Sequence, residues 1–149
     1  MSKYLNYTCF IIVTAVLSSF SFPVETATGG DLRIEVTGLR NDKGFVLLSL
    51  FNNGDGFPSK TEKACWKYQE KIKNGKAYFT CNALAAGTYA IAVLHDENAN
   101  LKMDLRFYGY PKEGYGFSEN PRLWFGPPSF KSASFQHVSE QLVSITIRY

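Results

Sequence analysis

The densest group of chemically active side chains lies between His95 and Asp104. Side chains that bear oxygen recur there at every second residue, which is the spacing of a calcium-binding loop. In that scheme the first, third, fifth, seventh and ninth places fall on Asp96, Asn98, Asn100, Lys102 (through its carbonyl) and Asp104. Because hard oxygen ligands suit Ca²⁺, the segment predicts a calcium site.

An EF-hand is excluded, since Leu101 stands where its glycine is required and Phe107 stands where its bidentate glutamate is required. A looser site needs Glu113 to fold back toward the loop, with the weak affinity of extracellular calcium modules. The alternative needs no metal. Asp and Asn side chains often bond their own backbone in Asx turns, and successive turns of this kind would organise the loop by themselves.

Aromatic side chains crowd the region that follows. They are Phe107, Tyr108, Tyr110, Tyr115, Phe117, Trp124, Phe125 and Phe130. Exposed rings beside polar groups stack on sugars or hold a peptide, so we predict ligand contacts at Tyr108, Tyr110, Tyr115 and Trp124. The alternative is a satellite core in which the rings cover one end of the domain.

Acid and base groups are available at His95, Asp96, Glu113 and His137, but no pattern places them around a nucleophile. The two histidines lie too far apart in sequence to suggest a zinc site. The sequence therefore assigns no catalytic residue and favours a protein that is not an enzyme.

The strands that must position these groups follow from period-two alternation and, at 45–51, from a nearly continuous apolar run typical of a strand covered on both sides. Segments 32–37, 45–51, 66–72, 77–82, 89–94, 135–138 and 141–148 read as strands. We expect hairpins at 32–51 and at 66–82, and a long loop from His95 to about Phe130. Short strands without a crossover helix predict an all-β fold, a single antiparallel Greek-key β-sandwich of about seven strands. Leu84 to Tyr89 has the spacing of a tyrosine corner.

Two motifs carry a family resemblance. His95-Asp96-x-Asn98-x-Asn100 with Asp104, and Gly109-x-Pro111-x-Glu113-Gly114-x-Gly116-Phe117-Ser118, resemble the signature of a secreted bacterial family of unknown function numbered 2141. The resemblance covers roughly residues 31–149. It implies a small exported sandwich, similar to prealbumin-like and immunoglobulin-like domains, with no established activity. Where that family usually has glycine in the Asn loop, this chain has Ala99 and Leu101.

Lys3 and the apolar run from Cys9 to Phe22 predict a signal peptide at 1–22, followed by a linker at 23–30 and the sandwich domain at 31–149. The run is shorter than the roughly 20 residues of a bilayer-spanning helix, so no membrane span is expected in the mature chain. The compartment is then periplasmic or extracellular. Disulfides persist there, and a five-residue hairpin loop sets Cys65 opposite Cys81, which predicts a bridge. A tight Asn74-Gly75 turn would instead keep them apart.

The 149 residues carry 16 basic and 13 acidic side chains, a net charge of +3 with no basic run. Nucleic acid is therefore not an expected partner. The function that the sequence favours is an exported binding or accessory module of the bacterial envelope, with an envelope protein or carbohydrate as partner. The alternatives are a small envelope enzyme and a structural domain without a ligand.

Overall fold

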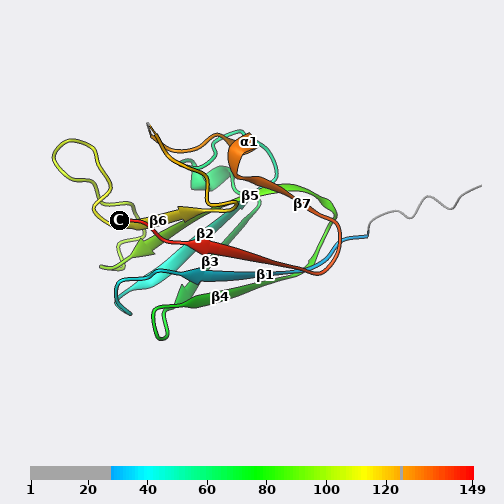
Figure 1. Ribbon diagram of the computed structural model, residues 1–149, viewed down its shortest axis with the longest axis horizontal. Coiled ribbons are helices and arrows are strands. Elements are labelled where there is room, and N and C mark those ends of the chain that lie inside the picture. The colour runs from blue at the N-terminus through cyan, green and yellow to red at the C-terminus, as the bar shows by residue number, and fades with distance from the viewer. Residues whose placement is uncertain (1–27, 125) are drawn as a thin grey trace, which may run out of the picture.

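Two β-sheets packed face to face form the molecule, as the computed structural model shows (Figure 1). It describes residues 28–124 and 126–149, so the predicted signal peptide lies outside the described residues. The strands are β1 (Gly30–Thr37), β2 (Phe45–Phe51), β3 (Trp66–Lys71), β4 (Ala77–Leu84), β5 (Gly87–Asp96), β6 (Gly114–Phe117), β7 (Ser134–His137) and β8 (Gln141–Thr146). A 3₁₀ turn, η1 (Thr61–Lys63), and one helical turn, α1 (Phe130–Ala133), complete the elements.

The all-β prediction is confirmed, with eight strands among the described residues where about seven were expected. One sheet has the order β4-β1-β8 and the other β3-β2-β5-β6, with β7 paired to the first half of β5. The additional strand, β6, lies inside the segment predicted to be a loop. One pair, β1 with β8, is parallel, so the sandwich is not antiparallel throughout. No helix among residues 28–124 and 126–149 is long and apolar enough to cross a membrane.

Both predicted hairpins are wrong. The chain changes sheets after β1 and again after β3, so β1 does not pair with β2 and β3 does not pair with β4. Only an isolated bridge between Lys73 and Lys76 closes the second turn. Period-two alternation identifies a strand and its buried face, but it does not say which neighbour receives the hydrogen bonds.

The main core lies between the sheets. Inward-pointing residues of both sheets form it, such as Leu32, Ile34 and Val36 of β1 and Ile91 and Val93 of β5, all at most 3% exposed. The tyrosine corner is confirmed, because the Tyr89 hydroxyl donates to the Ala85 carbonyl at 3.1 Å. That bond anchors the start of β5, which is the strand that leads into the His95 segment.

Candidate functional site

The polar segment predicted to bind calcium begins at the end of β5, where Asp96 is fully buried. Its Oδ1 accepts a hydrogen bond from the Asn100 backbone N–H at 3.1 Å, and its Oδ2 accepts one from the Leu101 N–H at 2.7 Å. The Asp96 carboxylate thus stabilises the turn formed by the next five residues. The charge is stabilised inside the protein by two backbone dipoles rather than by a basic side chain.

Further Asx turns follow. Asn98 Oδ1 accepts from the Asn100 N–H at 3.1 Å, and Asn100 Oδ1 accepts from the Lys102 N–H at 2.8 Å. Both amide groups also donate to Asp104, from Asn98 Nδ2 at 2.8 Å and from Asn100 Nδ2 at 3.0 Å. The alternating oxygens are therefore used to fold the loop, and the Lys102 side chain is exposed.

Glu113 closes the same segment from its far end and folds back toward it, which was the condition for a looser calcium site. It is 3% exposed. Its Oε1 accepts from the Glu97 N–H at 3.0 Å and its Oε2 from the Asp104 N–H at 3.0 Å. A single buried carboxylate thus ties both arms of the loop between residues 97 and 113, here called the signature loop, to one point.

The carboxylate oxygens that could bind calcium are already engaged in hydrogen bonds. Each oxygen of Asp96, Asp104 and Glu113 accepts an N–H hydrogen bond. Within the described residues no group of three His, Cys, Asp or Glu side chains is placed to hold a metal. An ion would have to replace these hydrogen bonds, and the successive Asx turns that formed the alternative interpretation are present.

His95 anchors the base of the signature loop and is fully buried. Its Nε2 lies 2.9 Å from the Lys43 carbonyl oxygen and its Nδ1 lies 2.6 Å from the Tyr149 hydroxyl. Since a carbonyl can only accept, Nε2 carries the proton and Nδ1 accepts from Tyr149. Both ring nitrogens are thus used in structural bonds, which leaves His95 without a free base for catalysis.

The polar cluster extends from Tyr149 to the surface. The Tyr149 oxygen accepts from the Arg40 N–H at 3.0 Å, and the Arg40 guanidinium lies 4.3 Å from the centre of the Tyr149 ring. The same guanidinium forms an ion pair with Glu97, to which Asn41 also donates at 3.0 Å. Burial would raise the pKa of Glu97, but these hydrogen bonds outweigh it and lower that pKa. Burial raises the pKa of Tyr149, which keeps its hydroxyl protonated as a donor.

Tyr149 is a residue that the sequence analysis missed. After β8 the chain crosses to β6, where Tyr115 and Arg148 exchange two backbone hydrogen bonds of 2.9 and 2.8 Å. A Cβ atom on Gly114 would lie 2.6 Å from the Tyr149 ring, and one on Gly116 would lie 2.8 Å from Ile145. The two glycines of the second motif thus allow this close approach. They were the sequence signal that could have indicated a close contact of this strand with another segment.

Ser118, the last residue of the second motif, is also buried. Its hydroxyl accepts from the Ile91 N–H at 2.8 Å and donates to the Ala133 carbonyl, which joins β5 to α1. The signature residues His95, Asp96, Glu113 and Ser118 are therefore buried structural groups. Their common effect is to hold the signature loop and its neighbours in place.

The far end of the signature loop is a closed turn that projects beyond the sheets at the upper left of Figure 1. The backbone of Arg106 donates to Tyr110 at 2.7 Å, and Gly109 donates to Arg106 at 2.8 Å. The rings there are exposed: 95% for Phe107, 84% for Tyr108 and 71% for Tyr110. We call residues 105–110 the aromatic tip.

The remaining aromatic residues divide between the two interpretations. Trp124, in a separate loop, is 80% exposed. Tyr115, Phe117 and Phe130 pack in a second cluster, where Phe57 makes edge-on ring contacts with Phe117 and Phe130 at 6.1 and 5.9 Å. Phe125 lies outside the described residues. Of the predicted ligand contacts, Tyr108, Tyr110 and Trp124 are thus open to solvent, and Tyr115 is half-buried.

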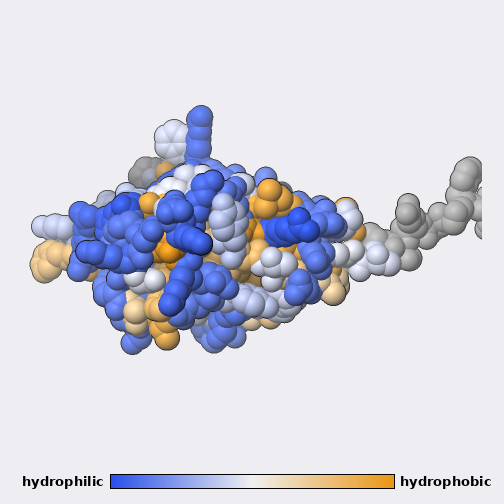
Figure 2. All heavy atoms as spheres, turned by 90° about the horizontal axis from the view of Figure 1, so that it is seen from below, coloured by the Kyte–Doolittle hydropathy of each residue, from blue (hydrophilic) through white to orange (hydrophobic). Residues whose placement is uncertain are grey.

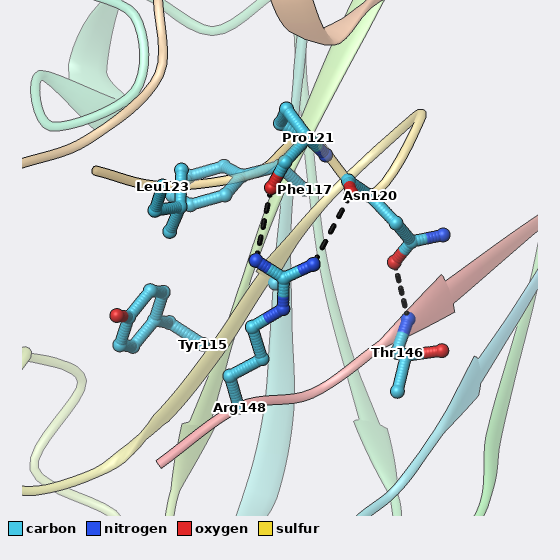
Figure 3. A pocket seen from close by; sticks show the side chains of 8 residues that line it. Tyr115, Phe117, Asn120, Pro121, Leu123, Thr146 and Arg148 are labelled. Carbon is cyan, nitrogen blue, oxygen red and sulfur yellow. Dashed lines mark hydrogen bonds between the residues drawn. The ribbon is translucent and has the colours of Figure 1, made fainter.

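A small hollow beside Tyr115 offers no ligand site. It is lined by Tyr115, Phe117, Leu123 and neighbouring residues, and Figure 3 shows the Arg148 guanidinium across it. Arg148 donates to the Pro121 and Asn120 carbonyls at 2.9 and 3.1 Å. The cavity volume of about 10 Å³ has room for about one water molecule.

The predicted disulfide is not formed. Cys65 and Cys81 are both free thiols, and the Cys65 Sγ donates to the Leu50 carbonyl at 3.2 Å. The bridge was derived from a hairpin, whereas β3 and β4 belong to different sheets. Burial raises the pKa of both thiols, that of Cys81 to about 12. Neither is an activated nucleophile, since nucleophilic cysteines have lowered pKa values.

His137, the other candidate acid or base, is fully buried. Its Nε2 lies 3.1 Å from the Gly30 carbonyl and 3.2 Å from the Leu84 carbonyl, and its ring packs edge-on against Tyr89. Its Nδ1 has no hydrogen-bond partner among the described residues. Each histidine thus serves a different part of the fold, and the structure does not bring them together.

Comparison with known proteins gives one result. No curated protein and no solved structure matches the chain. A family profile described as an uncharacterized protein conserved in bacteria (DUF2141) matches residues 34–146, which span β1 to β8 and include both motifs. The chain therefore belongs to this bacterial family of uncharacterized proteins, DUF2141.

Proposed function

We propose that this protein is an exported binding module of the bacterial envelope and that the aromatic tip is its contact surface. The observation that carries the proposal is the exposure of Phe107, Tyr108 and Tyr110 on a turn that is closed by its own backbone hydrogen bonds. Large exposed apolar groups gathered at one place mark interaction sites. The partner that we propose is a component of the bacterial envelope.

The architecture beneath the tip supports a binding role. Asp96 and Glu113 clamp the signature loop through four backbone N–H groups. A loop held in one conformation before contact loses less entropy when it binds. The role of these buried signature residues is then to hold the exposed aromatic tip in one conformation.

Export is part of the proposal and is supported by the sequence before residue 28. The charged start at Lys3 and the short apolar run to Phe22 are typical of a signal peptide. An enzyme is the weaker alternative, because His95 and the buried carboxylates of Asp96 and Glu113 are occupied by structural hydrogen bonds, and the fully buried His137 lies in another part of the fold.

Retention on isolated bacterial envelopes tests the role of the tip. The purified full chain is sedimented with envelope fragments, and the bound fraction is compared with that of Phe107→Ser/Tyr108→Ser/Tyr110→Ser. The matched control, Val138→Ser/Leu142→Ser, removes exposed apolar side chains elsewhere. We expect the tip variant to lose retention and the control to keep it. Equal retention of all three proteins would show that the tip is not the contact surface.

Calcium binding by the 95–104 loop is a second proposal. Its support is the convergence of Asn98 and Asn100 on Asp104, which gathers oxygen-bearing side chains within one turn. Because an ion must displace N–H donors from Asp96 and Asp104, we propose the weak affinity of extracellular modules, with Kd on the order of 10⁻⁴–10⁻³ M. This proposal is independent of the tip.

A further inference from the structure

We infer that the aromatic tip docks onto an anionic lipid bilayer, with its rings at the headgroup level. The inference rests on the proposed function and names the partner of the same surface. Its apolar part is larger than the three rings, because Leu105 and Leu101 on the same loop are 58% and 62% exposed. Figure 2 shows hydrophobic groups at the left extremity of the molecule, the end toward which the loop projects in Figure 1.

The exposed charges around these groups are positive. Within the signature loop Lys102, Arg106 and Lys112 are exposed, and none of them forms a salt bridge with a described residue. The acidic residues of the loop are paired, buried or hydrogen-bonded: Glu97 pairs with Arg40, Glu113 is buried, and the half-buried Asp104 carboxylate accepts hydrogen bonds from Asn98 and Asn100. The loop thus presents cationic charge without exposed anionic charge.

The adjacent turns add to this charge. Gly44 packs against the Asp96 backbone, and the Lys43 carbonyl bonds His95, so the turn after β1 lies beside the base of the loop. Lys43 and Lys73 are exposed there, and the acidic Asp42 accepts from the backbone N–H groups of Asn74 and Gly75. Asp42 is exposed too, but the exposed basic side chains named at this end, Lys43, Lys73, Lys102, Arg106 and Lys112, outnumber it.

The shape of the surface favours a bilayer over a sugar or a peptide. Binding sites for small ligands are concave, whereas the tip is a convex turn in which the Phe107 ring is 95% exposed. Tyrosine and other amphipathic rings settle at the membrane interface, and nearby Lys and Arg side chains are attracted to anionic headgroups. A protruding apolar turn with a basic surround satisfies both requirements at once.

Vesicle binding of the full chain tests the inference. We compare vesicles of phosphatidylglycerol and phosphatidylcholine with vesicles of phosphatidylcholine alone, and measure the partition coefficient by sedimentation. The variants are the tip triple-serine protein and Arg106→Glu/Lys112→Glu, and the controls are Val138→Ser/Leu142→Ser and Lys60→Glu/Lys67→Glu. We expect binding to the anionic vesicles to fall by at least about fivefold for each basic residue removed. The triple-serine variant should lose binding, and both controls should match the wild type.

A reporter at the tip separates its contact from any contact made by the apolar segment 9–22, which all variants share. The Phe107→Trp protein is mixed with anionic vesicles that contain brominated lipid. Quenching beyond that of the wild type supports insertion of the tip, and quenching equal to the wild type overturns it. Equal binding to neutral and anionic vesicles also overturns the inference. If the tip is needed for envelope retention but purified lipid does not bind it, the proposed function stands and the lipid partner is rejected.

Discussion

The Tyr149 hydroxyl and the His95 Nδ1 lie 2.6 Å apart and form a hydrogen bond across 54 residues of sequence. This bond joins the end of the chain to the strand that carries the first family motif. Gly114 and Gly116 allow the approach by leaving space where a side chain would collide. The two motifs therefore act together. The glycines of the second motif leave space for the Tyr149 ring, and Tyr149 bonds His95 of the first motif.

Removing the Tyr149 hydroxyl tests the contribution of this hydrogen bond to stability. Tyr149→Phe leaves the buried Nδ1 of His95 without its donor, and a buried polar group without a partner costs about 1–3 kcal/mol. The free energy of unfolding, measured with urea, should fall by that amount. Tyr78→Phe is the control, because Tyr78 is 60% exposed. An unchanged stability of Tyr149→Phe would mean that water replaces the hydroxyl.

Glu113 allows a test of the clamp beneath the aromatic tip. Glu113→Gln replaces one of two accepting oxygens with an NH₂ group that faces a backbone donor, so we expect a loss of about 1–3 kcal/mol. Amide hydrogen exchange should accelerate at Glu97 and Asp104, whose N–H groups bond this carboxylate. Glu119→Gln, at an exposed position, should change neither. Unchanged exchange at both amides would contradict the clamp.

Exposed and buried aromatic residues should differ in how much their removal lowers the stability. Trp124→Ala should change the free energy of unfolding by less than about 0.5 kcal/mol, since Trp124 is 80% exposed. Phe117→Ala should cost about 3–5 kcal/mol, because this ring is buried against Phe57. Thermal and urea unfolding of both variants measure the difference. A large loss from Trp124→Ala would place that ring in the satellite core.

The Cys81 thiol predicts a stability that depends on alkaline pH. Burial, together with nearby Cys65 and Asp31, raises its pKa from the ordinary 9.0 to about 12. The folded state thus holds the proton more tightly than the unfolded state, so this contribution is present below pH 9 and is lost as the pH rises toward 12. Above pH 9 the free energy of unfolding should therefore fall more steeply in the wild type than in Cys81→Ala.

Cys65→Ala is the matched control for this slope, because Cys65 is exposed and its removal should reduce the slope less. Alkylation of the native protein should modify Cys65 before Cys81. If the denatured, unreduced protein showed no reactive thiol at either position, a bridge would be present and the free-thiol arrangement would be wrong.

Calcium is tested by melting the protein in EDTA, in Ca²⁺ and in Mg²⁺. Binding to the folded form stabilises it by about 2.7 kcal/mol when free calcium reaches 100 times Kd, and raises Tm by several degrees. Asp104→Asn and Asp96→Asn should abolish a rise that is specific to Ca²⁺. The same Tm in Ca²⁺ and EDTA would reject the calcium site and show that the Asx turns organise the loop without a metal.

Local features of the fold were predictable because their interactions span few residues. Alternation alone identifies the inward residues of β1, such as Ile34, because successive side chains of a strand point to opposite faces. The Tyr89 corner reaches back four residues, and the bonds of Asp96 reach forward four and five residues. In each case the partner lies within the same short segment, so residue type and spacing suffice.

Only the tertiary structure decided which strands pair and which distant side chains meet. β1 pairs with β4 and, in parallel, with β8, so β4 does not form a hairpin with β3, the strand that follows Cys65. His95 contacts Tyr149 because the residues that follow β8 lie beside β6, where Arg148 pairs with Tyr115. Such contacts depend on how two apolar faces bury each other over the whole chain, and a period-two pattern is equally compatible with several pairings. The amino-acid sequence by itself thus determined seven of the eight described strands, the family and the two alternatives for the polar loop, while tertiary packing decided that the signature residues are buried and the aromatic tip is exposed.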